Sequence, residues 1–133
     1  RTFSIGEGPT AEWQKMHDAA VEGFETLAKV IKDRTTTTEA EEAAEVIHKR
    51  GYSIYDDLVH GVNQYPPIFQ TKTTRRHDSR EITFRENMVI VIQPNLITQD
   101  QKMGLQFGET LVVTRQGCES LNAYPREWVV CQG

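Results

Sequence analysis

The 133-residue sequence lacks a long apolar run, an excess of basic residues and internal repeats. No stretch approaches the roughly 20 apolar residues that span a bilayer, and no secretory signal pattern is visible. Fifteen basic residues against 19 acidic ones give a formal charge of -4, so the sequence has no basic footprint for a nucleic acid. We therefore expect neither a membrane nor a nucleic-acid partner, and one domain with a modest core.

Cysteine is also scarce, because only Cys118 and Cys131 occur. These two side chains could be buried thiols or could form a disulfide bond. Disulfides persist mainly in oxidising compartments, and the sequence shows no secretory signal. We therefore expect reduced thiols and a cytoplasmic location.

Two short apolar runs rich in β-branched residues stand out in the segment 82–125. They are Met88–Ile92 and Thr110–Thr114, and a polar segment around Thr98–Lys102 separates them. Turn-forming residues bound each run, which is typical of largely buried strands. The strands that we expect in a curved, mostly antiparallel sheet are Arg1–Ile5, Glu81–Phe84, Met88–Gln93, Leu105–Thr114 and Trp128–Cys131.

Two helices are predicted before most of these strands. The first spans about Thr10–Lys32, with Thr10 as its N-cap. Its apolar residues recur every three or four positions, as on one buried helix face: Trp13, Met16, Ala20, Phe24, Leu27 and Ile31. The second spans about Glu39–Arg50, with a capping-box pattern over Thr38–Glu41 and Gly51 just past its end. The predicted fold class is α+β, with both helices on the convex face of the sheet.

Three blocks of the sequence resemble the pita-bread metallohydrolases, the family of Xaa-Pro aminopeptidases, prolidases, methionine aminopeptidases and creatinase. Segment 87–94, with Asn87-Met88-Val89 and Ile92-Gln93-Pro94, resembles the family's G-M-V-x-T-I-E-P block. Segment 104–114 resembles G-V-R-I-E-D-T-V-L-V-T, and segment 117–125 resembles G-x-E-x-L-T-x-x-P. The three blocks occur in the family's order with compatible spacing. The resemblance implies the pita-bread fold.

The beginning of the chain also matches this family. The family's R-T-F motif immediately follows the second of two metal-binding aspartates, and here Arg1-Thr2-Phe3 opens the sequence. The resemblance therefore implies that residues 1–133 form a single domain, the C-terminal portion of a pita-bread domain whose N-terminal half is absent. We expect the sequence to be a fragment of a longer protein, since it begins with Arg1 and not with methionine.

The same resemblance identifies candidate site residues. His60, followed by Gly61, matches the family's metal-ligand histidine, whereas the family's two metal-binding glutamates match Gln93 and Gly108. The family binds two divalent metals such as Mn, Co or Zn through two Asp, one His and two Glu. Gln93 supplies no charge and Gly108 no side chain. Glu109 would point to the opposite face of its strand unless a bulge turned it inward. We therefore expect no metal cofactor, and His60 becomes the candidate catalytic residue.

Several polar residues are expected to line the cleft. By resemblance these are Gln93, Asn95, Gln106, Gly108 and Glu109. Amide groups suit hydrogen bonding to a neutral polar ligand, although they could equally satisfy backbone groups in a former cleft. The remaining histidines have no such support. We expect His17 and His48 to be exposed on helices and His77 to lie in a surface loop.

Three functions stay open at this stage. The chain could be a non-catalytic module that binds a peptide or a small amide. It could be a metal-independent, creatinase-like hydrolase of C–N bonds, with His60 as general base. It could also be a metallopeptidase with a rewired site. Without its N-terminal half the sheet would leave apolar surface and strand edges uncovered, so we expect a homodimer.

Overall fold

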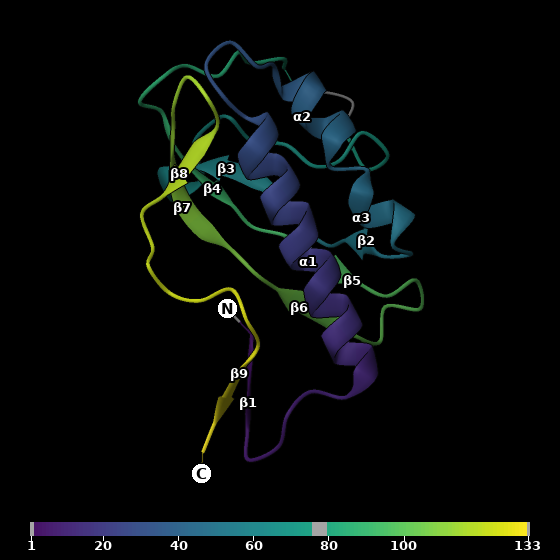
Figure 1. Ribbon diagram of the computed structural model, residues 1–133. Coiled ribbons are helices and arrows are strands. Elements are labelled where there is room, and N and C mark those ends of the chain that lie inside the picture. The colour runs from purple at the N-terminus through teal and green to yellow at the C-terminus, as the bar shows by residue number, and fades with distance from the viewer. Residues whose placement is uncertain (1, 76–79, 133) are drawn as a thin grey trace.

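The structure, a computed structural model, describes residues 2–75 and 80–132. One long helix, α1 (Ala11–Val30), crosses over the strands, and two short helices, α2 (Thr37–Ala43) and α3 (Val46–Lys49), pack beside it (Figure 1). The strands form three small sheets with mostly antiparallel pairing. This arrangement confirms the predicted α+β class.

In the described part of the chain, nine short strands build the three sheets, and one 3-10 turn follows β3. They are β1 (Phe3–Ile5), β2 (Ser53–Ile54), β3 (Val59–Gly61), η1 (Val62–Gln64), β4 (Val89–Ile92), β5 (Asn95–Ile97), β6 (Gly104–Gln106), β7 (Glu109–Val113), β8 (Cys118–Ser120) and β9 (Val129–Cys131). The largest sheet has the order β3-β4-β7-β8, and a second has the order β2-β5-β6. Strands β1 and β9 form a separate pair, which is parallel.

Helix α1 forms because its N-terminus is capped and one of its faces is apolar. The Thr10 hydroxyl accepts a hydrogen bond from the Trp13 amide at 3.4 Å, which satisfies one of the unpaired donors of the first turn. The buried face contacts β4, β5, β6 and β8, and Phe24 at its centre is fully buried. Gly23 lets α1 approach α3, since a Cβ there would lie 2.9 Å from the Ile47 side chain.

Two of the predicted strands differ from the structure. Segment 81–84 forms only an isolated bridge between Thr36 and Thr83, because its backbone pairs with the loop that enters α2 and not with another strand. The predicted strand 105–114 is broken at Phe107 and Gly108, so that β6 and β7 belong to different sheets. The short strands β2, β3, β5 and β8 were not predicted.

The predicted second helix is also interrupted. Around Glu45 the backbone switches to shorter-range hydrogen bonds, from the Glu45 amide to the Glu42 carbonyl at 3.3 Å and from the Ile47 amide to the Ala44 carbonyl at 3.1 Å. The capping box lies two residues earlier than predicted, between Thr36 and Glu39. The backbone amide of Thr36 donates to the Glu39 carboxylate at 2.7 Å, and this bond lowers the Glu39 pKa.

The histidines outside the candidate site differ from expectation. His17 is 3% exposed, between the rings of Phe107 and Trp128, so its predicted exposure is wrong. His48 is half-buried and not exposed as predicted, and its Nε2 lies 2.7 Å from the Thr71 hydroxyl. His77, predicted in a surface loop, lies outside the described residues.

Neither cysteine forms a disulfide bond in the structure. Cys131 is exposed, whereas Cys118 is half-buried and donates a hydrogen bond to the Ile31 carbonyl at 3.2 Å. Burial disfavours the thiolate and raises the pKa of Cys118 to about 12. Among the described residues, no helix is both long and apolar enough to cross a membrane.

Candidate functional site

The strand register places several predicted site residues on one face of the sheets. His60 on β3 pairs with Val91 on β4, which pairs with Thr110 on β7. Side chains alternate between the two faces of a strand, so Gln93, two residues after Val91, points to the same face as His60. The alternate residues, including Ile92 and Leu111, are fully buried in the core under α1. The candidate site therefore lies on the face that α1 does not cover.

Gln93 and Gly108 meet directly across this face. A Cβ built on Gly108 would lie 3.2 Å from the Gln93 Cα and 3.1 Å from the Ile92 carbonyl oxygen. Glycine at position 108 therefore allows the start of β7 to approach the end of β4 closely. The hollow of about 170 Å³ at this point is lined by Val91, Gln93, Gln106, Gly108, Glu109, Thr110 and Asn122.

Gln106 connects this hollow to a second, shallow one of about 320 Å³ over the β2-β5-β6 sheet. Besides Gln106, its lining consists of Tyr55, Asn95, Leu96, Ile97, Gly104 and Leu105. The structure therefore brings together four predicted cleft residues in the first hollow and places Asn95 with Gln106 in the second. His60 lines neither hollow, although it lies on the same face as Gln93.

The three predicted amide side chains differ in their hydrogen bonding. The Asn95 amide oxygen accepts from the backbone amides of Tyr55 at 2.9 Å and Asp56 at 2.7 Å, and its nitrogen donates to the Asp57 carbonyl at 2.9 Å. Asn95 thus holds the turn after β2. In the part of the chain that the structure describes, the side-chain amides of Gln93 and Gln106 have no such partner. Both amides are available to a ligand.

His60 has a defined tautomer and an unsatisfied nitrogen. The side chain is 7% exposed, and its Nδ1 lies 2.7 Å from the Gly61 carbonyl oxygen. A carbonyl only accepts, so this bond assigns the proton to Nδ1 and leaves Nε2 as an acceptor. The Nε2 atom is buried and has no hydrogen-bond partner among the described residues. A donor group from a ligand would satisfy this buried acceptor.

Glu109 points to the core side, as expected for a strand residue next to Gly108 without a bulge. It pairs with Ile92 and is 3% exposed. Its carboxylate accepts a hydrogen bond from the Ser120 hydroxyl at 2.5 Å and lies 3.5 Å from Nε of Arg126. The guanidinium of Arg126 in turn lies 4.8 Å from the centre of the Phe24 ring. The buried charge of Glu109 is therefore compensated within the fold.

Four residues around the site were not singled out from the sequence. Thr110 and Asn122 line the first hollow, and Ser120 and Arg126 hold Glu109. Ser120 and Asn122 lie inside the third matched block, 117–125, so their place in that block was the signal that could have identified them. Arg126 follows the block directly, and only its contact with Glu109 reveals its role.

The described residues of this face offer few of the donor groups that a two-metal site uses. Among residues 2–75 and 80–132, no three His, Cys, Asp or Glu side chains lie close enough together to hold a metal ion. The face offers the Nε2 atom of His60 and neutral amide groups such as that of Gln93. A pair of divalent cations needs several carboxylates to balance its charge.

Comparisons with known proteins agree with the fold. Residues 1–115 match the sequence model of the metallopeptidase family M24. An ectoine hydrolase from Halomonas elongata is 27% identical over 140 residues, which cover 98% of this chain and 33% of that protein.

Solved structures show the same architecture. The X-Pro aminopeptidase of Thermotoga maritima has a TM-score of 0.79 and 29% identity, over 98% of this chain and 36% of that one. The dipeptidase PepE of Mycobacterium ulcerans has a TM-score of 0.80 and 22% identity, over 100% of this chain and 35% of that one. The chain spans about a third of the length of these relatives. The family match covers most of the sequence, and the chain therefore belongs to the metallopeptidase family M24, with the C-terminal part of the pita-bread fold.

Proposed function

We propose that this chain is a divergent M24 module that binds a neutral peptide or a small amide and does not hold a dinuclear metal centre. The ligand would bind on the sheet face that α1 does not cover, which we call the open face. The observation that carries the proposal is the pair of unpartnered amides, Gln93 and Gln106, which border one hollow together with Gly108. An amide group both donates and accepts hydrogen bonds, as a peptide bond does. Glu109, the acidic residue in the lining of this hollow, is paired with Arg126.

The shape of the face supports a ligand larger than a single residue. Gln106 borders both hollows, so the two lie next to each other, with Asn122 in the lining of one and Tyr55 in the lining of the other. Tyr55 is 78% exposed, so its ring offers an apolar contact surface in the second hollow. The proposal includes a cytoplasmic location, with which the two free thiols agree.

A metal-independent hydrolase of C–N bonds is the second candidate. The observation that favours it is the buried Nε2 of His60, which has no hydrogen-bond partner among the described residues and could accept a proton from an attacking water as a general base. An ectoine hydrolase and an X-Pro aminopeptidase are among the similar proteins. A metallopeptidase with a rewired site is the third candidate, and it would need a group of at least three His, Cys, Asp or Glu ligands, which the described residues do not form.

Metal analysis tests the first part of the proposal. We expect no stoichiometric Mn, Co or Zn after dialysis, and no Xaa-Pro or methionine aminopeptidase activity that added Mn or Co stimulates. The reason is that Gln93 and Gly108 supply no charge, and even changes around the ligands of a metal cost about 10- to 100-fold in affinity. One bound equivalent, or metal-dependent turnover that disappears in His60→Ala, would establish the metallopeptidase instead.

Ligand titration tests the second part. A neutral probe, N-acetyl-dialanine methylamide, should bind on the open face. Its dissociation constant should be about three- to tenfold higher for Gln93→Ala and for Gln106→Ala, because each variant loses one net hydrogen bond to the probe. Binding can be followed by NMR titration. Gln116→Ala, an exposed glutamine in the turn between β7 and β8, is the matched control and should bind like the unaltered protein.

Two results would contradict this second part. The first is equal binding by all three variants. The second is tighter binding of the charged counterpart, N-acetyl-dialanine carboxylate, because a neutral amide face should not favour an anion. Slow cleavage of the probe that vanishes in His60→Ala without added metal would favour the metal-independent hydrolase.

We also propose that the protein forms a homodimer through the β1–β9 pair. Phe3, Ile5 and Val130 are exposed on this two-stranded ribbon. Each strand has one edge without a strand partner in the described residues. Exposed apolar side chains and open edges favour association. Light scattering at tens of micromolar should report a dimer that Ile5→Lys dissociates and Val62→Lys, at an exposed site elsewhere, does not. A monomeric unaltered protein would disprove the proposal.

A further inference from the structure

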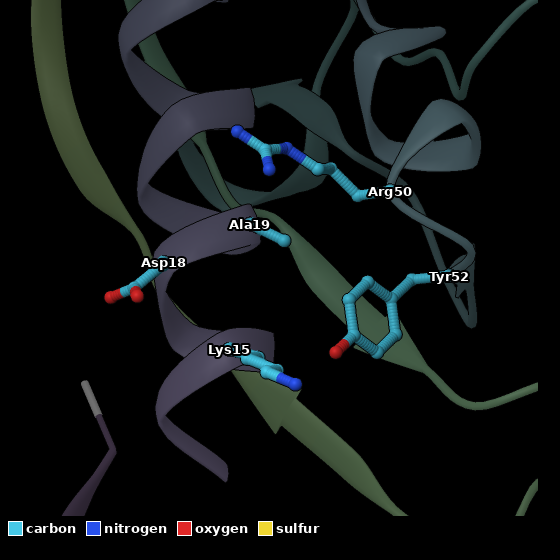
Figure 2. Close-up of a pocket in the computed structure, with 5 residues that line it drawn as sticks. All are labelled: Lys15, Asp18, Ala19, Arg50 and Tyr52. Atoms are coloured by element: carbon cyan, nitrogen blue, oxygen red, sulfur yellow. The ribbon is translucent and has the colours of Figure 1, made fainter. Parts of the chain in front are cut away.

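A third hollow lies on the helical side of the molecule, away from the candidate cleft. It has a volume of about 260 Å³ and lies between α1, the end of α3 and the start of β2. Its lining residues are Lys15, Asp18, Ala19, Arg50 and Tyr52 (Figure 2). None of them lines either hollow of the cleft face. A ligand here would therefore bind independently of the site described above.

The local backbone explains why this hollow exists. Gly51 has a φ of +87°, a conformation that side-chain-bearing residues rarely adopt, and it turns the chain sharply at the end of α3. The turn leaves Arg50 and Tyr52 on the two sides of the opening (Figure 2). Across from them, α1 presents Ala19, whose single methyl group leaves the space unfilled.

Hydrogen-bond donors around this hollow exceed its acceptors. Arg50 donates through Nε to the Glu22 carboxylate at 2.6 Å, which leaves the two terminal nitrogens of its guanidinium for other partners. In the described part of the chain, the Lys15 ammonium and the Tyr52 hydroxyl have no hydrogen-bond or ion-pair partner. Figure 2 shows the Lys15 side chain reaching toward the Tyr52 hydroxyl.

The lining also contains one acidic residue, Asp18, and the carboxylates of Glu22 and, to a smaller extent, Asp18 raise the pKa of Arg50. Asp18 accepts a hydrogen bond from the side-chain nitrogen of Gln14 at 2.7 Å. In Figure 2 its carboxylate lies on the other side of α1 from Tyr52. Glu22 is already paired with Arg50, and among the described residues the Lys15 ammonium forms no ion pair. An anion placed between Lys15, Arg50 and Tyr52 would meet three donors of different geometry.

We propose that this hollow, which we call the helical hollow, binds a small molecule through a single carboxylate or phosphate group. The anionic group lies between Lys15 and Arg50, and the body of the molecule lies against the Tyr52 ring and Ala19. A volume of about 260 Å³ is below the range typical of sites for drug-sized ligands, so the ligand has few atoms beyond its anionic group. The helical hollow is distinct from the cleft that binds the neutral probe, so a negative result for one proposal leaves the other standing.

The test is an NMR titration of the purified protein at constant ionic strength with sodium phosphate, sodium benzoate and, as the neutral isostere of benzoate, benzamide. Saturable shifts should centre on residues 15–19 and 50–52 for at least one of the two anions. Phosphate alone would identify phosphate esters as the ligand class, and benzoate alone would identify carboxylates with a flat body. Gln93→Ala should leave these shifts unchanged.

Single-residue variants distinguish a specific anion site from non-specific attraction of anions to the charged surface. Lys15→Met and Tyr52→Phe should each weaken anion binding, the lysine variant by about tenfold, because it removes a charge-assisted contact. Lys29→Met removes an exposed lysine elsewhere on α1 and should change nothing. The proposal is overturned by an absence of saturable shifts or by equal binding of benzamide and benzoate. It is also overturned by equal losses in the Lys15 and Lys29 variants.

Discussion

A Phe107→Ala variant should lose about 4 kcal/mol of unfolding free energy, which is a large part of the stability of a small domain. Phe107 is fully buried, and the centre of its ring lies 5.2 Å from that of Phe24 and 5.9 Å from that of His17. It occupies the break between β6 and β7, where the chain passes from one sheet to the other. Its neighbours Gln106 and Gly108 both line the candidate site. The cavity that the alanine variant leaves should therefore also weaken binding of the neutral probe.

Urea denaturation of three variants measures this effect. Phe107→Leu keeps most of the buried volume and should lose less than about 1.5 kcal/mol. Phe84→Ala removes another fully buried ring, which packs against Phe69 outside the cleft hollows. It should cost as much stability as Phe107→Ala but leave binding of the neutral probe unchanged under native conditions. A Phe107→Ala variant with nearly full stability would contradict the packing described here.

Gly61→Ala should cost about 2–3 kcal/mol by steric conflict. A Cβ at this position would lie 2.6 Å from the Tyr65 carbonyl oxygen and 2.9 Å from the Pro66 carbonyl oxygen. Both contacts are with backbone, and the Gly61 amide already donates to the Tyr65 carbonyl at 2.6 Å. The turn formed by η1 and residues 65–66 must therefore move away, and His60 beside it becomes accessible.

Two measurements follow this substitution. Urea denaturation gives the stability, and modification by diethyl pyrocarbonate reports how readily His60 reacts. Gly104→Ala is the matched control, because its Cβ would lie 3.5 Å from both the Ile97 side chain and the Leu96 carbonyl oxygen, which is ordinary contact. It should stay within about 0.5 kcal/mol of the unaltered protein. Equal behaviour of the two alanine variants would show that the turn over Gly61 is not tightly packed.

Long periodic patterns in the sequence predicted the main elements of the fold. Helix α1 was predicted because six apolar residues at helical spacing and a threonine cap indicate the same element. Strands β4 and β7 were predicted because turn residues bound their β-branched runs. Strands of two or three residues, such as β2, carry too few positions to show a period. Their existence depends on partners that are distant in sequence, as the pairing of β2 with β5 illustrates.

Hydrogen bonds in the structure distinguish the site amides that hold the fold from those that a ligand can reach, and the sequence alone does not. Asn95 and Gln93 look alike in sequence, but the shorter Asn95 side chain is fully used by the turn after β2, whereas Gln93 is not. The capping box moved from Thr38 to Thr36 for a similar reason. Either threonine suits a helix start, but the Thr38 hydroxyl donates to Glu81 at 2.6 Å, a contact from another part of the chain.

The parallel pairing of β1 with β9 has a consequence for the order of folding. It aligns Phe3 with Val129 and Ile5 with Cys131, so forming it closes a loop of nearly the whole chain. Closing such a loop has a high entropic cost, and only three residue pairs offset that cost. We therefore expect this ribbon to form last, after the helix and both larger sheets have brought its two strands together. Once formed, it is the first part to open in local unfolding, and its amide hydrogens exchange with solvent while those of β4 and β7 remain protected.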